Sequence, residues 1–237
     1  MFALCQPKNT FIYDGRGIEL HKLTESLGVQ YLPYHFLLTL YDNRRLKYYD
    51  TTTGHIIADH TAKNSYTFMT QNKSNAIIAM GTTKGVVEWW TPGIGTAAIQ
   101  LFVGSKVDGI AFHKGYMYTI ADSLKVWDCR TLKMLVEQPL MRRAKNIVAS
   151  DSGLVGVNYG YKIEFFKDLH VEKQTHLYLR HETAGKNNVN NLAFAPFEDV
   201  VGLGTNKGFS SIIIPGSGVP FYDTFENNPF ESKKQKR

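Results

Sequence analysis

Two stretches of the chain share one pattern, AIIAMGTTKGVVEWW at residues 76–90 and VVGLGTNKGFSSIII at residues 200–214. Each consists of an apolar run, a turn that contains Gly, Lys and Gly, and a second apolar run, which together predict a β-hairpin. Gly81 aligns with Gly204 and Gly85 with Gly208, so the copies lie 123 residues apart (from 81 to 204), or three steps of 41. The chain is therefore expected to repeat a unit of about 40 residues between them.

Further copies of the unit are marked by an alternating apolar strand that runs into an aromatic residue. The positions after these strands are separated by 41, 37, 39 and 47 residues, and they are Asp50, Thr91, Asp128, Lys167 and Ile214. Two strand patterns precede each of them, and Asp or Thr at this place favours a turn into one more strand. Four short strands in about 40 residues are typical of a β-propeller blade. VWD at 126–128 is a WD-type signature, and the predicted structural residues are Trp90, Trp127 and Asp128.

The predicted fold is all-β, a WD-repeat β-propeller; a β-sandwich is the alternative, but it gives no reason for the regular step. Residues 1–226 are assigned to the propeller and 227–237 to the start of a short basic C-terminal extension. The expected blades are 27–62, 64–103, 106–141, 143–183 and 186–226, with 1–26 as a partial blade that lacks its first strand. We expect seven blades in the full protein and about five and a half here, with a missing segment or a partner closing the ring. Gly81, Gly85, Gly204 and Gly208 are expected in turns with positive φ.

Composition fits a packed intracellular domain. Of the 237 residues, 43% are hydrophobic and 20% are charged, and no apolar run of about 18 residues or secretory signal pattern is present. Cys5 and Cys129 are far apart in sequence, and we expect reduced thiols rather than a disulfide. A formal net charge of +6 favours polyanions such as RNA, although such a charge also serves solubility alone.

Catalytic and cofactor motifs are absent from the sequence. GTTKG does not have P-loop spacing, GSGVPF at 216–221 is not a dinucleotide-binding motif, and no G-x-S-x-G elbow occurs. The eight histidines and two cysteines show no zinc-ligand spacing. We therefore expect no enzyme, no cofactor, no metal and no small-molecule substrate.

Basic clusters are the candidate contact residues for RNA or for partners. Loops on a propeller rim are exposed, so cations there could meet phosphates, although ordinary solvated charge is the alternative. One cluster is expected in a hairpin turn, one in a loop between blades and one in the C-terminal tail: Arg44 and Arg45; Arg142, Arg143 and Lys145; Lys233, Lys234, Lys236 and Arg237.

The C-terminal run from LAFAPFEDVVGLG at 192–204 to NPFESKKQ at 228–235 exceeds what a blade requires. It resembles the U-three small nucleolar RNA-associated protein seven family, whose other landmarks are similar to YLPYHFLL at 31–38 and DTTTGHIIADHTAK at 50–63. The chain departs from the family where Gly-Thr replaces Gly-His at 81–82 and 204–205. The matched positions include Pro196, Glu198, Asp199, Gly204, Gly208, Pro215, Gly216, Gly218, Asn228 and Pro229.

The resemblance implies a non-catalytic scaffold of the small-subunit processome in the nucleolus. Its partners would be other processome proteins, including further WD-repeat propellers, pre-ribosomal RNA and the U-three snoRNA, and its role would be small-subunit rRNA processing and ribosome biogenesis. No membrane is implied. The alternative is a WD-repeat peptide-binding adaptor in another multiprotein complex, because the fold alone does not separate these roles.

Overall fold

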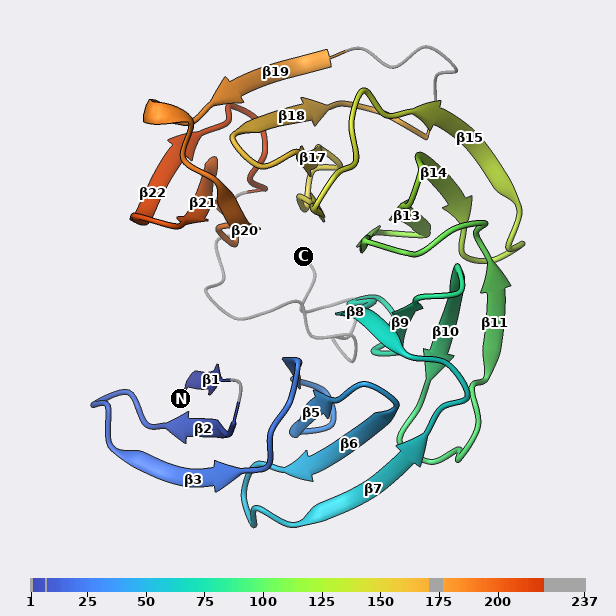
Figure 1. Cartoon of the computed structure of the whole chain (residues 1–237), viewed down its shortest axis with the longest axis vertical. Coiled ribbons are helices and arrows are strands. Elements are labelled where there is room, and N and C mark those ends of the chain that lie inside the picture. The colour runs from blue at the N-terminus through green and yellow to red at the C-terminus, as the bar shows by residue number, and fades with distance from the viewer. Residues whose placement is uncertain (1, 7, 171–176, 220–237) are drawn as a thin grey trace, which may run out of the picture.

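The computed structural model describes residues 2–6, 8–170 and 177–219. In these residues 22 strands form six antiparallel sheets, and the sheets stand side by side around a centre like blades (Figure 1). No helix in these ranges is long and apolar enough to cross a membrane. The prediction of an all-β WD-repeat propeller is confirmed.

Four central sheets have four described strands each, paired in sequence order. The second sheet contains β4 (Gly28–Leu32), β5 (Leu37–Tyr41), β6 (Arg45–Asp50) and β7 (Ile56–Thr61). The third contains β8 (Tyr66–Gln71), β9 (Ile78–Thr82), β10 (Val86–Trp90) and β11 (Ile99–Phe102). The fourth contains β12 (Gly109–His113), β13 (Tyr116–Ile120), β14 (Ser123–Asp128) and β15 (Met134–Pro139). The fifth contains β16 (Asn146–Ala149), β17 (Val155–Asn158), β18 (Lys162–Phe166) and β19 (Leu177–Glu182).

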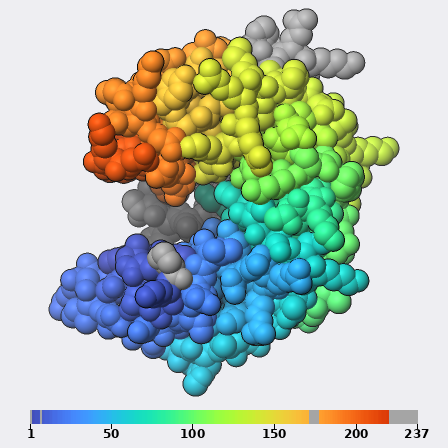
Figure 2. Space-filling model, viewed as in Figure 1, coloured from blue at the N-terminus to red at the C-terminus, as the bar shows by residue number. Residues whose placement is uncertain are grey.

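The first and sixth sheets have three described strands each. The first contains β1 (Phe2–Cys5), β2 (Thr10–Tyr13) and β3 (Glu19–Leu23). The sixth follows a 3-10 turn at Ala184–Lys186 and contains β20 (Val189–Phe194), β21 (Val200–Thr205) and β22 (Gly208–Ile213). The fourth strand expected before residue 226 lies outside the described residues. Figure 2 shows the ring open between the blue first sheet and the orange-red sixth sheet.

The propeller arrangement sorts the loops to two ends of the disc. The first strand of each four-stranded sheet lies innermost and packs on the next one, as β8 does on β12 and β12 on β16 (Figure 1). Turns between second and third strands then share one end with the connectors between sheets. Backbone bonds join them, for example from the Ala62 amide to the Arg44 carbonyl (2.8 Å) and from the Val189 amide to the Gly160 carbonyl (2.9 Å). We call this the connector end.

Buried aromatic residues of the third strands anchor the packing between sheets. Trp127 on β14 is 8% exposed, and its Nε1 donates to Thr119 Oγ1 on β13 at 3.0 Å. Trp90 on β10 is 3% exposed, stacks on His60 at 5.6 Å and donates from Nε1 to Glu88 Oε2 at 3.2 Å. These side chains thus contact both their own sheet and the neighbouring sheet, and they stabilise the packing between the two.

Aspartates at the ends of third strands form equivalent turns. The Oδ1 atoms of Asp14, Asp50 and Asp128 accept bonds at 2.8–2.9 Å from backbone amides two residues later. In all three sheets the pairing with the following strand is also shifted just before the aspartate. The strands β1 to β3 therefore correspond to second, third and fourth strands. In the described residues the first sheet has no inner strand, so Phe2 and Leu4 of β1 are exposed, whereas β5 and β9 are buried throughout.

The two turns of the repeat are equivalent, but two of the four glycine predictions are wrong. GTTKG joins β9 to β10 and GTNKG joins β21 to β22, in sheets three positions apart. Gly85 (φ 75°) and Gly208 (φ 140°) have positive φ, whereas Gly81 and Gly204 lie within strands. A Cβ on Gly81 would lie 2.9 Å from Val107 Cγ1, so this glycine admits the neighbouring connector.

Candidate nucleic-acid interface

Arg44 and Arg45 lie at the turn from β5 to β6, at the connector end. Both side chains are exposed and make no hydrogen bond or ion pair with the described residues. The backbone of Arg44 is fixed by the bond from the Ala62 amide, and Tyr66 donates similarly to the Asn43 carbonyl at 2.8 Å. A rigid turn therefore presents two mobile cationic side chains to solvent.

Arg142, Arg143 and Lys145 lie on the connector from β15 to β16, and their side chains are engaged. Arg143 makes a bidentate ion pair with Asp108, with Nε–Oδ2 at 2.6 Å and a second bond at 3.0 Å. This hydrogen bonding raises the pKa of Arg143. Lys145 Nζ donates to Asn188 Oδ1 at 2.6 Å, and Arg142 donates to the Tyr161 hydroxyl at 3.3 Å. This cluster links adjacent blades. Asp108 neutralises the charge of Arg143, whereas Arg142 and Lys145 keep their charge but are held by neutral partners.

The fold adds single lysines that the sequence did not group with the clusters. Counted over described residues only, the connector-end loops contain ten Lys or Arg against four Asp or Glu, whereas the loops of the opposite end contain six against five. Additional exposed lysines of the connector end are Lys8, Lys63, Lys84, Lys186 and Lys207. The repeat of GTTKG and GTNKG places Lys84 and Lys207 at equivalent turns, but no pattern in the sequence groups these two with Lys8, Lys63 and Lys186.

The motif residues of the sixth sheet form a backbone clasp. Asp199, at the start of β21, accepts from the Gly218 amide (2.7 Å) and the Gly216 amide (3.0 Å), and these bonds lower the pKa of its carboxyl. A Cβ on Gly218 would lie 2.6 Å from the carbonyl carbon of Glu198, so only glycine fits without a shift. The Pro215 carbonyl accepts from the Tyr178 hydroxyl at 2.8 Å. The clasp fixes the segment that follows β22.

The remaining motif positions lie outside the hydrogen bonds of the clasp or outside the described residues. Pro196 and Glu198 lie exposed in the loop from β20 to β21, and Gly204 and Gly208 belong to the hairpin already described. Asn228 and Pro229, and the tail cations Lys233, Lys234, Lys236 and Arg237, lie outside the described residues.

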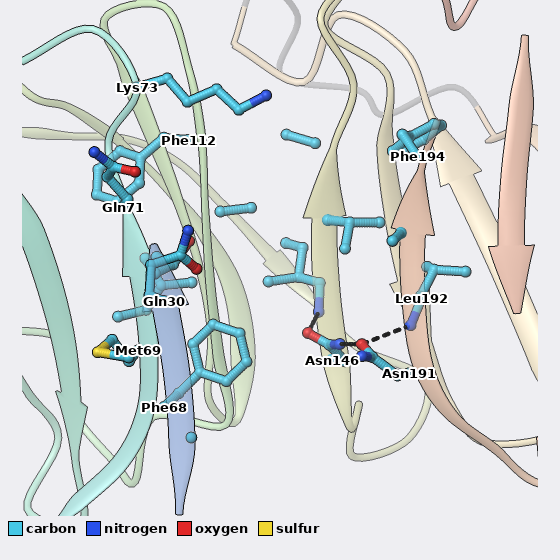
Figure 3. Close-up of a pocket in the computed structure, with 18 of the residues that line it drawn as sticks. Gln30, Phe68, Met69, Gln71, Lys73, Phe112, Asn146, Asn191, Leu192 and Phe194 are labelled. Carbon is cyan, nitrogen blue, oxygen red and sulfur yellow. Dashed lines mark hydrogen bonds between the residues drawn. The ribbon is translucent and has the colours of Figure 1, made fainter. Parts of the chain in front are cut away.

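The centre of the disc contains a cavity of about 540 Å³ lined by the inner strands. Gln30, Gln71 and Met69 lie on one side of it, facing Asn146 and Asn191 across the space (Figure 3). Asn146 Nδ2 donates to Asn191 Oδ1 at 3.3 Å. The described residues include no group of His, Cys, Asp or Glu that could hold a metal ion, and Cys5 and Cys129 are both free thiols. Amide and aromatic side chains of this kind can bind a ligand. Lys73 and Asp151 also line the cavity and form an ion pair at 3.9 Å.

Comparisons with known proteins agree with this architecture. The C-terminal WD40 domain of Sif2 superposes with a TM-score of 0.70 over 90% of this chain and 66% of that chain, at 12% identity, which shows the fold alone. A family model described as the BING4CT (NUC141) domain matches residues 177–237, which include the clasp.

Two relatives match nearly the whole chain. U3 small nucleolar RNA-associated protein 7 of Saccharomyces cerevisiae is 36% identical over 100% of this chain and 47% of its own length. WD repeat-containing protein 46 of Caenorhabditis elegans is 33% identical over 99% of this chain and 42% of its own length. The chain thus spans a little under half the length of these relatives. It belongs to the family of WD-repeat proteins that includes U3 small nucleolar RNA-associated protein 7 and WD repeat-containing protein 46.

Proposed function

We propose that this chain is part of a non-catalytic scaffold of the small-subunit processome, the nucleolar particle in which U3 RNA and the ribosomal RNA precursor assemble. The match to U3 small nucleolar RNA-associated protein 7 along the whole chain carries this proposal. In this role the protein contacts pre-ribosomal RNA, U3 RNA and other processome proteins, and it supports small-subunit rRNA processing.

The geometry is compatible with a scaffold rather than an enzyme. Inter-blade bonds such as Arg143–Asp108 and Lys145–Asn188 stiffen the rim of the disc, so its loops keep fixed relative positions. The central cavity is lined mainly by amide, aromatic and aliphatic side chains, and its Lys73 and Asp151 are paired with each other at 3.9 Å. A rigid disc with cationic loops can position RNA segments and proteins without chemistry.

Sedimentation of the tagged whole protein tests the proposal. Lysate is separated on a gradient and the RNA of each fraction is sequenced. Co-migration in a large particle with U3 RNA and small-subunit precursor rRNA is expected. Migration as a small species without RNA would overturn the scaffold function.

A peptide-binding adaptor is the second candidate, and the central cavity is the observation that favours it. Its amide-lined walls could bind the backbone of an extended peptide. Affinity purification separates the two functions. An adaptor would recover a protein partner that Asn146→Arg and Asn191→Arg abolish, whereas a processome scaffold would retain the particle in both variants.

A further inference from the structure

Six cations at the connector end share one setting, although they come from six separate loops. Each is exposed and stands directly beside an Asn or Thr in its loop, as Lys84 does beside Thr83 and Lys207 beside Asn206. None of the six side chains makes a hydrogen bond or an ion pair with the described residues. The six are Lys8, Arg44, Lys63, Lys84, Lys186 and Lys207.

The other cations of the connector-end loops bond to neighbouring residues, whereas these six make no bond with the described residues that holds the blades together. Arg143 and Lys106 both contact Asp108, and Lys145 bonds to Asn188, so these side chains have structural partners. The six free cations have no such structural partner among the described residues. Their charge is available to a ligand outside the disc.

Five of the six loops, all except that of Lys8, are joined to a neighbouring loop by backbone bonds between described residues. The Thr83 amide donates to the Ser65 carbonyl at 3.0 Å, which joins the loops of Lys84 and Lys63. The Asn206 amide donates to the Asn188 carbonyl at 3.1 Å, which joins the loops of Lys207 and Lys186. The cations therefore lie in one arc at the connector end, from the sixth sheet across the opening of the ring to the first three sheets, whereas the turns of the fourth and fifth sheets contribute none (Figure 2).

We infer that this connector-end arc binds the phosphate backbone of RNA, independently of sequence. The inference rests on the proposed function for the identity of the polymer. Lys and Arg with neighbouring Asn and Thr side chains are the groups that contact phosphates and sugars. A chain of phosphates has charges spaced along a line, and single cations at the sixth, first, second and third sheets can contact it at several points.

An acidic protein surface fits the arc less well than RNA does. Protein interfaces are anchored by aromatic and other apolar side chains in a desolvated core. The six loops contain no exposed large hydrophobic side chain among the described residues. Because they offer charge and polar donors without an apolar anchor, the favoured ligand is one that is bound through charge.

A matched pair of variants of the full chain tests the inference. The arc variant replaces the six cations by Gln. The control variant also replaces six cations by Gln, all in loops of the opposite end: Arg16, Lys73, Lys114, Arg130, Lys133 and Lys167. Both variants remove six positive charges, and both keep the side-chain length approximately. They differ in the end of the disc that is changed and in Lys73, which is exposed but pairs with Asp151 at 3.9 Å.

Binding of a fluorescent single-stranded RNA is measured by anisotropy at several KCl concentrations. Each phosphate contact contributes about 0.7 to the slope of log K against log salt for single strands. If all six cations make contact, the arc variant loses about 4 from the magnitude of this slope, whereas the control retains most of it. A smaller variant, Lys84→Gln with Lys207→Gln, is expected to lose about 1.4 and serves if the sixfold variant melts early.

Equal loss of slope in the arc and control variants would overturn the inference, because net charge and not the arc would then govern binding. Competition by polyglutamate as strong as that by RNA would also overturn it and would favour an acidic protein partner. Sedimentation keeps this test separate from that of the function. If the parent protein migrates with U3 RNA and the arc variant binds RNA as tightly as the parent, the scaffold function is retained and the proposed role of the arc is rejected.

Discussion

Truncation of Trp127 to alanine should destabilise the propeller strongly. The indole is 8% exposed and packs in a cluster that joins the third and fourth sheets, together with Val87 and Met117. Its removal leaves a cavity and costs about 3–5 kcal/mol, as large-to-small changes in cores do. In a chain of this length about 2–4 °C of melting temperature correspond to each kcal/mol, so the midpoint should fall by about 6–20 °C.

The hydrogen bond from the indole to Thr119 can be separated from the packing by a double-mutant cycle. Trp127→Phe keeps a ring in the cavity but leaves the fully buried Thr119 hydroxyl without its partner. Thr119→Val removes the hydroxyl, and the coupling between the two changes should be about 0.5–1.5 kcal/mol. Urea unfolding followed by circular dichroism gives the four free energies of unfolding.

An exposed aromatic residue supplies the control for these measurements. Phe209 on β22 is 78% exposed, so Phe209→Ala should change stability by less than about 0.5 kcal/mol. If Trp127→Ala melted within about a degree of the parent, the indole would not be a core residue and the strand register of the fourth sheet would be wrong.

Three further predictions concern turns, pH and the tail. Gly85→Ala should lower the melting temperature more than Gly208→Ala, because a Cβ at Gly85 would lie 2.6 Å from the Gly104 and Ser105 carbonyl oxygens, whereas Gly208 is open; equal midpoints would contradict this. Backbone hydrogen bonds lower the pKa of Asp199 below its ordinary value of 3.8, so its contribution is complete at neutral pH and is lost as the pH falls through the folded-state pKa. The destabilisation by Asp199→Asn should therefore shrink between pH 7 and pH 3 in urea titrations, and a constant difference would exclude the carboxylate as its cause. Reversal of the tail charges (Lys233, Lys234, Lys236 and Arg237 to Glu) should weaken association with the particle in gradients without changing the melting temperature; unchanged association would remove the tail from the contacts.

Local patterns in the sequence determined the architecture because each blade repeats the same requirements. Several sheets repeat three features: alternating apolar residues, an aromatic at the end of the third strand and an aspartate in the following turn. Each feature can be recognised in the sequence without knowledge of the neighbouring blades. The equivalence of GTTKG and GTNKG is of this kind, since the distance between them is a multiple of the repeat.

Features that depend on contacts between blades could not be predicted from the sequence. Gly81 resembles a turn glycine, yet its small size serves the approach of Val107 from the next connector. Arg143 resembles a free cation, yet Asp108, 35 residues earlier, neutralises it. Single lysines such as Lys63 and Lys186 belong to no local sequence pattern, and they become part of a candidate surface when the fold brings their loops to one end.

The sequence motif that marks the family and the surface proposed to bind RNA lie at different ends of the disc. Asp199, Gly216 and Gly218 meet in the clasp because the carboxylate accepts from both glycine amides, Gly216 has a positive φ of 72° and Gly218 has no room for a Cβ. The clasp belongs to the end opposite the connectors. Residues under such steric demand identify a fold family without being contact residues for a partner. A cationic arc needs charge within reach of a phosphate, and many loop sequences can provide it. The recognition motif therefore indicates which particle the protein joins, whereas its binding surface has to be found from the three-dimensional arrangement of charge.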